Sequence, residues 1–378
     1  MSTRPGGVAN ARDTASCSDE LLTWPFRYHF PQRSVRFGAG ALNQLPDVLA
    51  EVGISRAFAI VTPSQQSTVP RIREMLGTAL VHASTDVRAR VPLETVEIAV
   101  TAVGGGTADG LLALGGGSAT GLAKAVAAET RMPIVAIPTT YSGSEMTAIY
   151  GITIGARKHP RESPHVAPLA VIYDPELTLS MPAELTSNSG INALAQAIGS
   201  LYAGPSDPLS RLAAVQAIEL LTRSLPGCVL DPVDLSARSE ALLGAHLAGW
   251  ALAASGLSAH HDLAHALGDL TRLPHAAVHA ALLPQTTSRA LRHHPALAAP
   301  LQEALDCQQP AQTLFDFLLR VRAPTSLREL GLHDEDFQTA RNALHDDVPQ
   351  RWRDGGATEL DDVLARTFSG TRPPTTTT

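Results

Sequence analysis

Short apolar runs alternate with stretches of helical spacing through the first half of the chain. The apolar runs have the length of buried strands, and they lie at Arg56–Thr62, Leu80–Val87, Gly110–Leu114, Pro133–Thr140 and Ala170–Asp174. Helical spacing occurs between them, as at Ala41–Val52 and Pro92–Val103. Since strands that alternate with helices build parallel sheets, the pattern predicts an α/β domain with a doubly wound, mostly parallel sheet.

Two segments of this half have a less regular pattern. Pro25–Leu42 alternates apolar and polar residues around a Pro-Gln turn, which predicts a hairpin that ends in a glycine-rich bend. Gly155–Pro168 is polar without a clear period, so we expect a loop there.

After Pro182 the pattern changes to Ala- and Leu-rich helical segments, and no further strand pattern follows. The two ends of the chain are polar, have no period, and predict disorder. The predicted divisions are a disordered tail at 1–24, an α/β dinucleotide-binding domain at 25–182, an all-α catalytic domain at 183–371 and a disordered tail at 372–378.

Composition indicates an ordinary globular protein. The 378 residues are 44% hydrophobic with a net charge of −7, and with only Lys124 and Lys158 as lysines no basic patch predicts nucleic acid binding. Cys17, Cys228 and Cys307 have no C-x-x-C spacing, which argues against a disulfide framework and a thiolate metal site. No signal peptide pattern and no run of the roughly 18–20 apolar residues that cross a membrane occurs, so we expect a cytoplasmic protein without a membrane partner.

The segment Leu111–Lys124, LLALGGGSATGLAK, joins an apolar strand to a helix through three glycines and a serine. Glycine lets backbone N–H groups close on a phosphate, and a helix N-terminus adds partial positive charge. Ligands of open α/β sheets lie outside the carboxyl ends of the strands, where the loop YSGSEMT after Pro133–Thr140 also emerges. We therefore predict a pyrophosphate cradle, with plain turn chemistry as the alternative.

The predicted cofactor is NADH or NADPH. No acidic residue ends the strand before Thr62, so the choice between the two stays open. Ser118 is expected at the helix start, where it could act as an N-cap as well as a phosphate contact. The full set of predicted cofactor contacts is Thr62, Gly115, Gly116, Gly117, Ser118, Thr139, Thr140 and Ser142.

The second constellation is a group of five histidines in the helical half, at His260, His261, His265, His275 and His279. His261 and His265 are four residues apart and share a helix face, and His275 follows a Leu-Pro turn that could return it beside them. So many histidines in an apolar region favour a functional site over isolated core residues.

At this point several motifs resemble a known superfamily. GGGSATGLAK, PTTYSGSEMT, YDPELTLSMP, SGINALAQAI and HHDLAHALGDLTRLPH resemble, in order and spacing, the iron-containing alcohol dehydrogenase and dehydroquinate synthase-like proteins. Gly121, IYGIT, RAPTSLRELG and the terminal SGTRP look most like the maleylacetate reductase subgroup. The resemblance implies a nucleotide domain, a helical domain, a site in the cleft between them, and a homodimer.

The resemblance also bears on metal binding. Metal-dependent relatives hold Fe²⁺ or Zn²⁺ at positions that match Asn192, Gln196, His261 and His275. Two of the four are neutral amides here, and amides compensate poorly for the lost hydration of a divalent ion, so we expect no catalytic metal. Gln196 departs from the subgroup as well, which typically keeps histidine there.

The roles of the remaining candidates follow from the resemblance. His265 is the expected proton donor near the nicotinamide, and His261 and His275 are expected to stabilise the enolate oxygen. A dicarboxylate substrate also needs cations or hydrogen-bond donors, for which the candidates are Arg90, Arg157, Lys158, His260, Asn192 and Gln196. For the loop cations the alternative is a solvated charge, and for the amides it is a hydrogen-bond network in the cleft.

The expected function is NAD(P)H-dependent, metal-independent reduction of maleylacetate or a related 4-oxo-2-enoic dicarboxylate to a 3-oxoadipate-type product, in the catabolism of aromatic compounds. Two alternatives stay open because Gln196, Gly199 and Arg90 depart from the subgroup. The fold could reduce another ketone or enone in specialised biosynthesis, or it could act as a non-redox lyase or cyclase.

Overall fold

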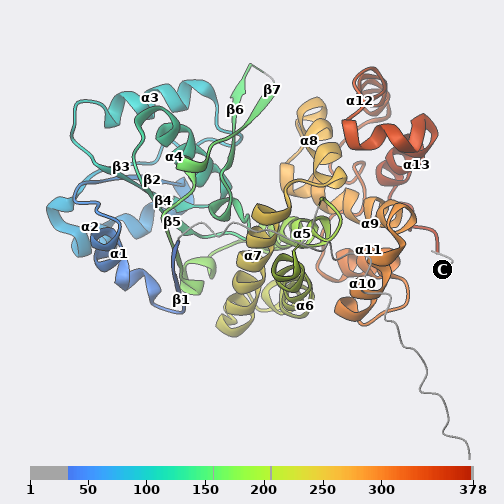
Figure 1. The fold of residues 1–378 in the computed structure, drawn as a ribbon, viewed down its shortest axis with the longest axis horizontal. Coiled ribbons are helices and arrows are strands. Elements are labelled where there is room, and N and C mark those ends of the chain that lie inside the picture. The colour runs from blue at the N-terminus through green and yellow to red at the C-terminus, as the bar shows by residue number, and fades with distance from the viewer. Residues whose placement is uncertain (1–32, 156, 205–206, 376–378) are drawn as a thin grey trace, which may run out of the picture.

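The computed structural model describes residues 33–155, 157–204 and 207–375. Within them the chain forms an α/β half followed by a helical half (Figure 1). The predicted tail at 1–24 and the first arm of the predicted hairpin at 25–42 lie outside the described residues. The predicted fold class is confirmed.

Six strands form one parallel sheet in the order β1-β8-β5-β4-β2-β3. Their bounds are β1 (Ser34–Phe37), β2 (Ala57–Val61), β3 (Leu80–Ser84), β4 (Gly110–Gly115), β5 (Ile134–Pro138) and β8 (Ala170–Tyr173). All five strands predicted from apolar runs are present. β1 pairs in parallel with β8, which places the second arm of the predicted hairpin inside the main sheet.

Both faces of the sheet are buried because successive side chains of each strand point to opposite sides. Ala57, Ala59 and Val61 of β2 pack into one core, and Phe58 and Ile60 pack into the other. The first core is completed by α1 (Leu45–Glu51) and α2 (Val69–Leu76), and the second by α3 (Leu93–Val103) and α4 (Gly117–Thr130). Burial on both faces explains why these strands appear in the sequence as continuous apolar runs.

β6 (Ile149–Ile154) and β7 (Arg157–Glu162) form a separate antiparallel hairpin. The prediction of a loop at 155–168 was therefore wrong for this segment. Tyr150 and Ile152 of β6 are buried against α4, whereas β7 has no fully buried residue. A strand without a buried face has no apolar period, so only its pairing with β6 reveals it.

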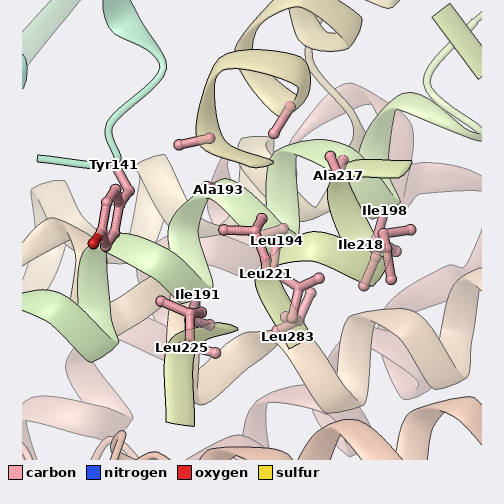
Figure 2. Close-up of a cluster of buried hydrophobic side chains, with 14 of the residues drawn as sticks. Tyr141, Ile191, Ala193, Leu194, Ile198, Ala217, Ile218, Leu221, Leu225 and Leu283 are labelled. Carbon is pink, nitrogen blue, oxygen red and sulfur yellow. The ribbon is translucent and has the colours of Figure 1, made fainter. Parts of the chain in front are cut away.

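The helical half contains no strand among the described residues after Pro182, as predicted. Its helices are α5 (Ala183–Ser200), α6 (Pro208–Leu230), α7 (Leu235–Ser255), α8 (Ala259–Thr271), α9 (His275–His293), α10 (Ala298–Leu305), α11 (Pro310–Arg320), α12 (Asp334–Asp346) and α13 (Gly356–Ser369). Every described residue of α5 from Thr186 to Ser200 is buried, with α6, α7 and α9 packed around it. Figure 2 shows Ile191, Leu194 and Ile198 of α5 in this core beside Leu221.

A buried arginine joins the two halves. Arg238 of α7 is fully buried, and its guanidinium donates to Thr186 Oγ1 at 2.9 Å, Met181 O at 3.2 Å and Tyr141 Oη at 3.3 Å. Its Nε donates to Pro232 O at 3.0 Å. Because Tyr141 lies in the loop after β5, this one side chain fixes that loop against the start of α5 and against α7.

The second predicted tail is ordered at its start. Arg372 forms an ion pair with Asp316, Gln312 Nε2 donates to Pro373 O at 3.1 Å, and Pro373 is buried. The prediction of disorder was therefore wrong for 372–375, because composition alone does not show that α11 offers a surface to this segment. Residues 376–378 lie outside the described residues.

None of the described helices is by itself long and apolar enough to cross a membrane. The combination of α7 and α8 meets the criterion of length and composition only as a pair that is bent by 101°.

The packing of α5 on α6 generates a stability prediction. A Cβ at Gly190 would lie 2.3 Å from Leu225 Cδ2 in the core, so Gly190→Ala is expected to lower the free energy of unfolding by about 1–3 kcal/mol. Urea unfolding followed by circular dichroism measures this. The matched control is Gly268→Ala in α8, where a Cβ meets nothing within 4 Å and helix propensity predicts a gain of up to about 1 kcal/mol. Equal losses in both variants would contradict the packing argument.

Candidate functional site

The three glycines between the end of β4 and the start of α4 lie against hydroxyl side chains predicted to bind the cofactor. A Cβ at Gly115 would be 2.5 Å from Thr62 Oγ1, and one at Gly116 would be 2.8 Å from Thr140 Oγ1. Gly115 also has a φ of +145°, which side-chain-bearing residues rarely adopt. The ends of β2, β4 and β5 therefore approach so closely that only glycine fits between them.

The cradle ends in the N-terminus of α4. Gly116 is the N-cap, and no side chain caps the helix, so the prediction of Ser118 as an N-cap was wrong. Ser118 lies in the first turn of α4. The residue before it, Gly117, lies beside the loop of Ser142: a Cβ at Gly117 would be 3.4 Å from the Cβ of Ser142. Thr139 is buried and its N–H donates to Gly115 O at 3.0 Å, which ties β5 to the cradle. The uncapped helix start is the kind of site that binds phosphate.

α5 holds the loop that lines the cradle. Gln196 Nε2 donates to Ser142 O at 2.7 Å, and Ser189 Oγ accepts from Tyr141 N at 2.8 Å. Asn192 lies one turn before Gln196 on α5 and is 8% exposed. The structure thus places the two nearly buried amides on one face of α5 and gives Gln196 the role of a loop anchor.

The histidines of α8 and α9 lie together, and a chain of hydrogen bonds fixes some of their tautomers. Thr286 Oγ1 donates to Leu282 O at 3.0 Å, so it accepts from His260 Nδ1 at 2.8 Å. His260 Nε2 then accepts from His279 Nδ1 at 2.8 Å. His279 Nε2 is left with a lone pair toward His275 Nε2, 3.2 Å away. Both ring nitrogens of His260 therefore have hydrogen-bond partners within the protein. This corrects the prediction that His260 contacts the substrate.

His261 has the opposite tautomer. The backbone N–H of Ser258, the N-cap of α8, donates to His261 Nδ1 at 3.4 Å, and Ser258 Oγ lies 2.9 Å from the same nitrogen. The proton therefore resides on His261 Nε2, which is buried and has no partner among the described residues. A Cβ at Gly199 would lie 2.6 Å from Ser258 Oγ, so the departure at Gly199 makes room for this cap. His261 offers a free N–H donor to the site.

The cluster is buried at one end and open at the other. His260, His261 and His279 are buried, His265 is half-buried and His275 is exposed. Burial lowers the pKa of His260 to about 3 and that of His265 to about 4. At neutral pH both are neutral imidazoles, and the cluster meets solvent on the side of His275.

Arg90 joins the two halves of the molecule. Its Nη1 donates to Gly268 O at 2.8 Å and its Nη2 pairs with Asp269, both at the end of α8. Its own backbone is held by Thr153 Oγ1, which donates to Arg90 O at 2.6 Å. The prediction of Arg90 as a substrate cation was therefore wrong, because α8 already uses its guanidinium.

The two neighbouring cations of β7 differ in their surroundings. Arg157 is exposed at the turn of the hairpin and is not brought to the histidines. Lys158 is half-buried, and its positive charge acts on His265 and His275. Alternation along the strand thus directs Lys158, and not Arg157, toward the cleft.

Two family profiles match most of the chain. The iron-containing alcohol dehydrogenase profile matches residues 31–175, and the C-terminal profile of the Fe-containing alcohol dehydrogenase family matches residues 186–357. The chain belongs to the iron-containing alcohol dehydrogenase family. Membership in this family makes the protein an oxidoreductase, as predicted.

Relatives within the iron-containing alcohol dehydrogenase family are similar over nearly the whole length. A maleylacetate reductase of Rhizobium sp. (strain MTP-10005) is 38% identical over 349 residues, which are 92% of this chain and 99% of the relative. Maleylacetate reductase 1 of Cupriavidus pinatubonensis is 37% identical and covers 90% of this chain and 96% of its own. The crystal structure of a maleylacetate reductase from Agrobacterium tumefaciens has a TM-score of 0.87 at 36% identity, covering 93% of this chain and all of its own.

The family name implies iron. The residues at the four positions that match the metal ligands of metal-dependent relatives do not fit an iron ion. His261 carries its proton on Nε2, and Gln196 Nε2 is committed to Ser142 O. Asn192, Gln196, His261 and His275 also include no negative charge. A divalent ion in such a cleft needs lone pairs from every ligand and draws on a carboxylate. These four side chains therefore fit a divalent ion poorly.

One other group among the described residues has the spacing of metal ligands. Nitrogen atoms of His265, His275 and His279 all lie within 4.8 Å of one another. The positive charge of Lys158 acts on two of the three, which opposes a cation and favours an anion beside them.

The sequence analysis assigned no role to two residues of the site, His279 and Ser258. His279 lies four residues after His275 on α9, and this spacing could have indicated that the two meet. Ser258 precedes α8 as a capping box in which histidine replaces the usual Glu or Gln, so the pattern was hidden.

The buried histidines predict acid sensitivity. The folded-state pKa of His260, about 3, lies below its ordinary value of 6.5, so between these values the unfolded chain binds a proton that the folded chain does not. Stability therefore falls as the pH drops below 6.5, by about 2 kcal/mol for His260 between pH 7.5 and 5.0. Urea unfolding at both pH values should show a smaller drop for His260→Gln, whereas His333→Gln at the exposed start of α12 should retain the full drop. An identical drop in His260→Gln would refute this assignment.

Proposed function

We propose that the protein is a metal-independent reductase that uses NADH or NADPH to reduce maleylacetate, or a related 4-oxo-2-enoic dicarboxylate, to a 3-oxoadipate-type product. The observation that carries the proposal is that α5 contacts both the Ser142 loop at the glycine cradle and His261 of a cluster of neutral histidines. The similarity to maleylacetate reductases over more than nine-tenths of the chain supports the substrate class.

The chain's own residues fit a dinucleotide. Gly115 and Gly116 lie against the side chains of Thr62 and Thr140. The first backbone N–H groups of α4 have no side-chain cap, and such a helix start beside hydroxyl side chains suits a pyrophosphate. The residue that follows β2 is Thr62 and not an acidic residue that would bind the ribose 2′-OH of NADH and repel the 2′-phosphate of NADPH. The proposal therefore includes both cofactors.

The chemistry needs a hydride, an electron acceptor and a proton. When bound, the reduced nicotinamide supplies a hydride to the alkene carbon β to the oxo group, the π electron pair shifts onto the oxo oxygen, and one proton adds to the α carbon. The chain must therefore stabilise a developing enolate oxygen and deliver a proton.

Histidine side chains meet both needs. His261 Nε2–H is a buried donor without a partner, and it supplies the hydrogen bond that an enolate oxygen requires. His275 donates its Nε2–H to His279 Nε2 at 3.2 Å, so this contact orients the ring, and the neutral imidazole has no second N–H for that oxygen. His265 is half-buried and neutral, so it can act as a proton relay: one ring nitrogen gives its proton to the α carbon while the other nitrogen takes one up from water.

Gln196, Gly199 and Arg90, the three residues that depart from the subgroup, each have a structural role. Their presence therefore does not require a reaction other than the one proposed. Gln196 hydrogen-bonds the loop of Ser142, and Gly199 leaves room for Ser258, which caps α8 and contacts His261. Arg90 hydrogen-bonds the C-terminal part of α8. No observation therefore favours the biosynthetic or non-redox alternatives over the reduction proposed here. Cytoplasmic location and a homodimer stay predictions.

Turnover after metal removal tests the proposal. Protein dialysed against a chelator, with less than one-tenth equivalent of iron or zinc by elemental analysis, is expected to oxidise NADH or NADPH when maleylacetate is added. The loss of absorbance at the reduced nicotinamide band and the appearance of 3-oxoadipate measure the reaction. Activity that disappears on dialysis and returns with Fe²⁺ or Zn²⁺ would contradict metal independence, and absence of turnover before dialysis would contradict the reaction.

The proton donor is tested by substitution. His265→Ala is expected to lower kcat by about 10²-fold or more, because general acid catalysis contributes at least that much, with dinucleotide affinity unchanged in calorimetry. Asp336→Asn in the first turn of α12 is the control for substitution in the helical half and should keep full activity. An unchanged kcat in the His265 variant would remove it from this role.

A further inference from the structure

The β6–β7 hairpin reaches from the α/β half toward α8 (Figure 1). Thr153 of β6 pairs with Lys158 of β7, and Thr153 N donates to Val91 O at 2.9 Å. The next residue back, Arg90, clasps Gly268 and Asp269 at the end of α8. Because His265 lies one helical turn before Asp269, this set of contacts places Lys158 beside the histidine cluster.

A glycine in β6 determines the course of the Lys158 side chain. A Cβ at Gly151 would lie 2.5 Å from Lys158 Cε, 3.1 Å from Cγ and 3.3 Å from Cδ. The aliphatic part of Lys158 therefore lies flat across Gly151, and any larger residue at this position would displace it. The lysine is directed along the hairpin instead of extending into solvent from the turn, as Arg157 does.

Lys158 is the cation of this group that keeps its charge unpaired. Arg90 is paired with Asp269, whereas no carboxylate of the described residues lies within ion-pair distance of Lys158 and none of their acceptors takes a hydrogen bond from its Nζ. Burial lowers the pKa of Lys158, and the more distant Asp269 charge offsets this only in part. The charge of Lys158 acts on His265 and on His275. An ammonium that is half-buried without a counter-ion favours an anionic ligand.

We propose that Lys158 binds one carboxylate of the substrate and that the β6–β7 hairpin thereby makes the enzyme prefer carboxylate substrates over uncharged ones. The proposal rests on the proposed function and adds a specificity-determining residue to it. The same ammonium argues against a metal ion on His265, His275 and His279, since a substrate carboxylate gains from the charge that a cation would oppose.

Kinetics with charged and uncharged substrates test the role of Lys158. Lys158→Met keeps most of the aliphatic chain and removes the charge, so the KM for maleylacetate is expected to rise about 10- to 100-fold, as for loss of a charge-assisted hydrogen bond, with kcat within about threefold. The dimethyl ester of maleylacetate has no carboxylate to bind, and its kcat/KM is expected to be the same in both enzymes. Lys158→Arg should restore most of the affinity for the diacid.

Three results would overturn the proposal: an unchanged KM for the diacid, equal losses with diacid and diester, or no rescue by arginine. Arg157→Met is the matched control, because it removes a neighbouring positive charge from the same strand and should leave both substrates unaffected. This control separates binding at Lys158 from a general effect of net charge.

Gly151→Ala gives an independent test, because a Cβ there displaces Lys158 without altering its charge. The KM for the diacid is expected to rise about 3- to 10-fold in this variant. The double variant with Lys158→Met should have the KM of Lys158→Met alone, since both changes remove one interaction. Additive effects of the two changes would contradict the proposal.

Binding measurements separate this proposal from the proposed function. Calorimetry with 3-oxoadipate in the presence of NAD⁺ or NADP⁺ measures dicarboxylate affinity without turnover. If the wild-type protein binds 3-oxoadipate through Lys158 but does not reduce maleylacetate, the proposed function fails and the role of Lys158 stands. If it reduces maleylacetate and Lys158→Met binds 3-oxoadipate as tightly as the wild type, the role of Lys158 fails alone.

Discussion

The close approach of two backbones at Gly143 and Gly249 is the constraint on which the site depends. A Cβ at Gly249 would lie 2.9 Å from Gly143 O, and one at Gly143 would lie 2.4 Å from Gln196 Oε1. The loop after β5 is therefore pressed between α5 and α7 with no space for a side chain. Because this loop also borders the glycine cradle, the contact fixes the distance between the nucleotide side of the cleft and the helices that carry the histidines.

The chemistry of the cleft depends on imidazoles that burial keeps neutral. The Thr286–His260–His279 chain leaves an acceptor at His279, and the cap of α8 leaves a donor at His261. In a buried site the tautomer of a histidine is set by the hydrogen bond on its other nitrogen. The fold thus leaves a buried N–H donor at His261, and in the proposed function this donor stabilises the developing negative charge.

The charges at the mouth of the cleft are distributed unevenly. Arg90 forms an ion pair with Asp269 of α8, whereas Lys158 lies across Gly151 without an ion-pair partner among the described residues. Two cations that look equivalent in the sequence therefore differ in function: one is structural, and the other is available to a ligand. The hairpin that carries Lys158 is also the element that the apolar pattern failed to predict.

The sequence by itself determined the parallel sheet, the helical second half, the glycine cradle and the gathering of histidines. Each of these depends on local periodicity, on glycine at a crowded turn, or on motifs in a fixed order, and such signals are readable residue by residue. Only the tertiary structure decided that His260 orients His279, that Ser258 caps α8 through His261, and that Arg90 pairs with Asp269 while Lys158 packs across Gly151. These outcomes depend on contacts between residues far apart in the chain or on the face of a strand, and hydrogen-bond geometry and ion pairing between such residues leave no periodic trace in the sequence.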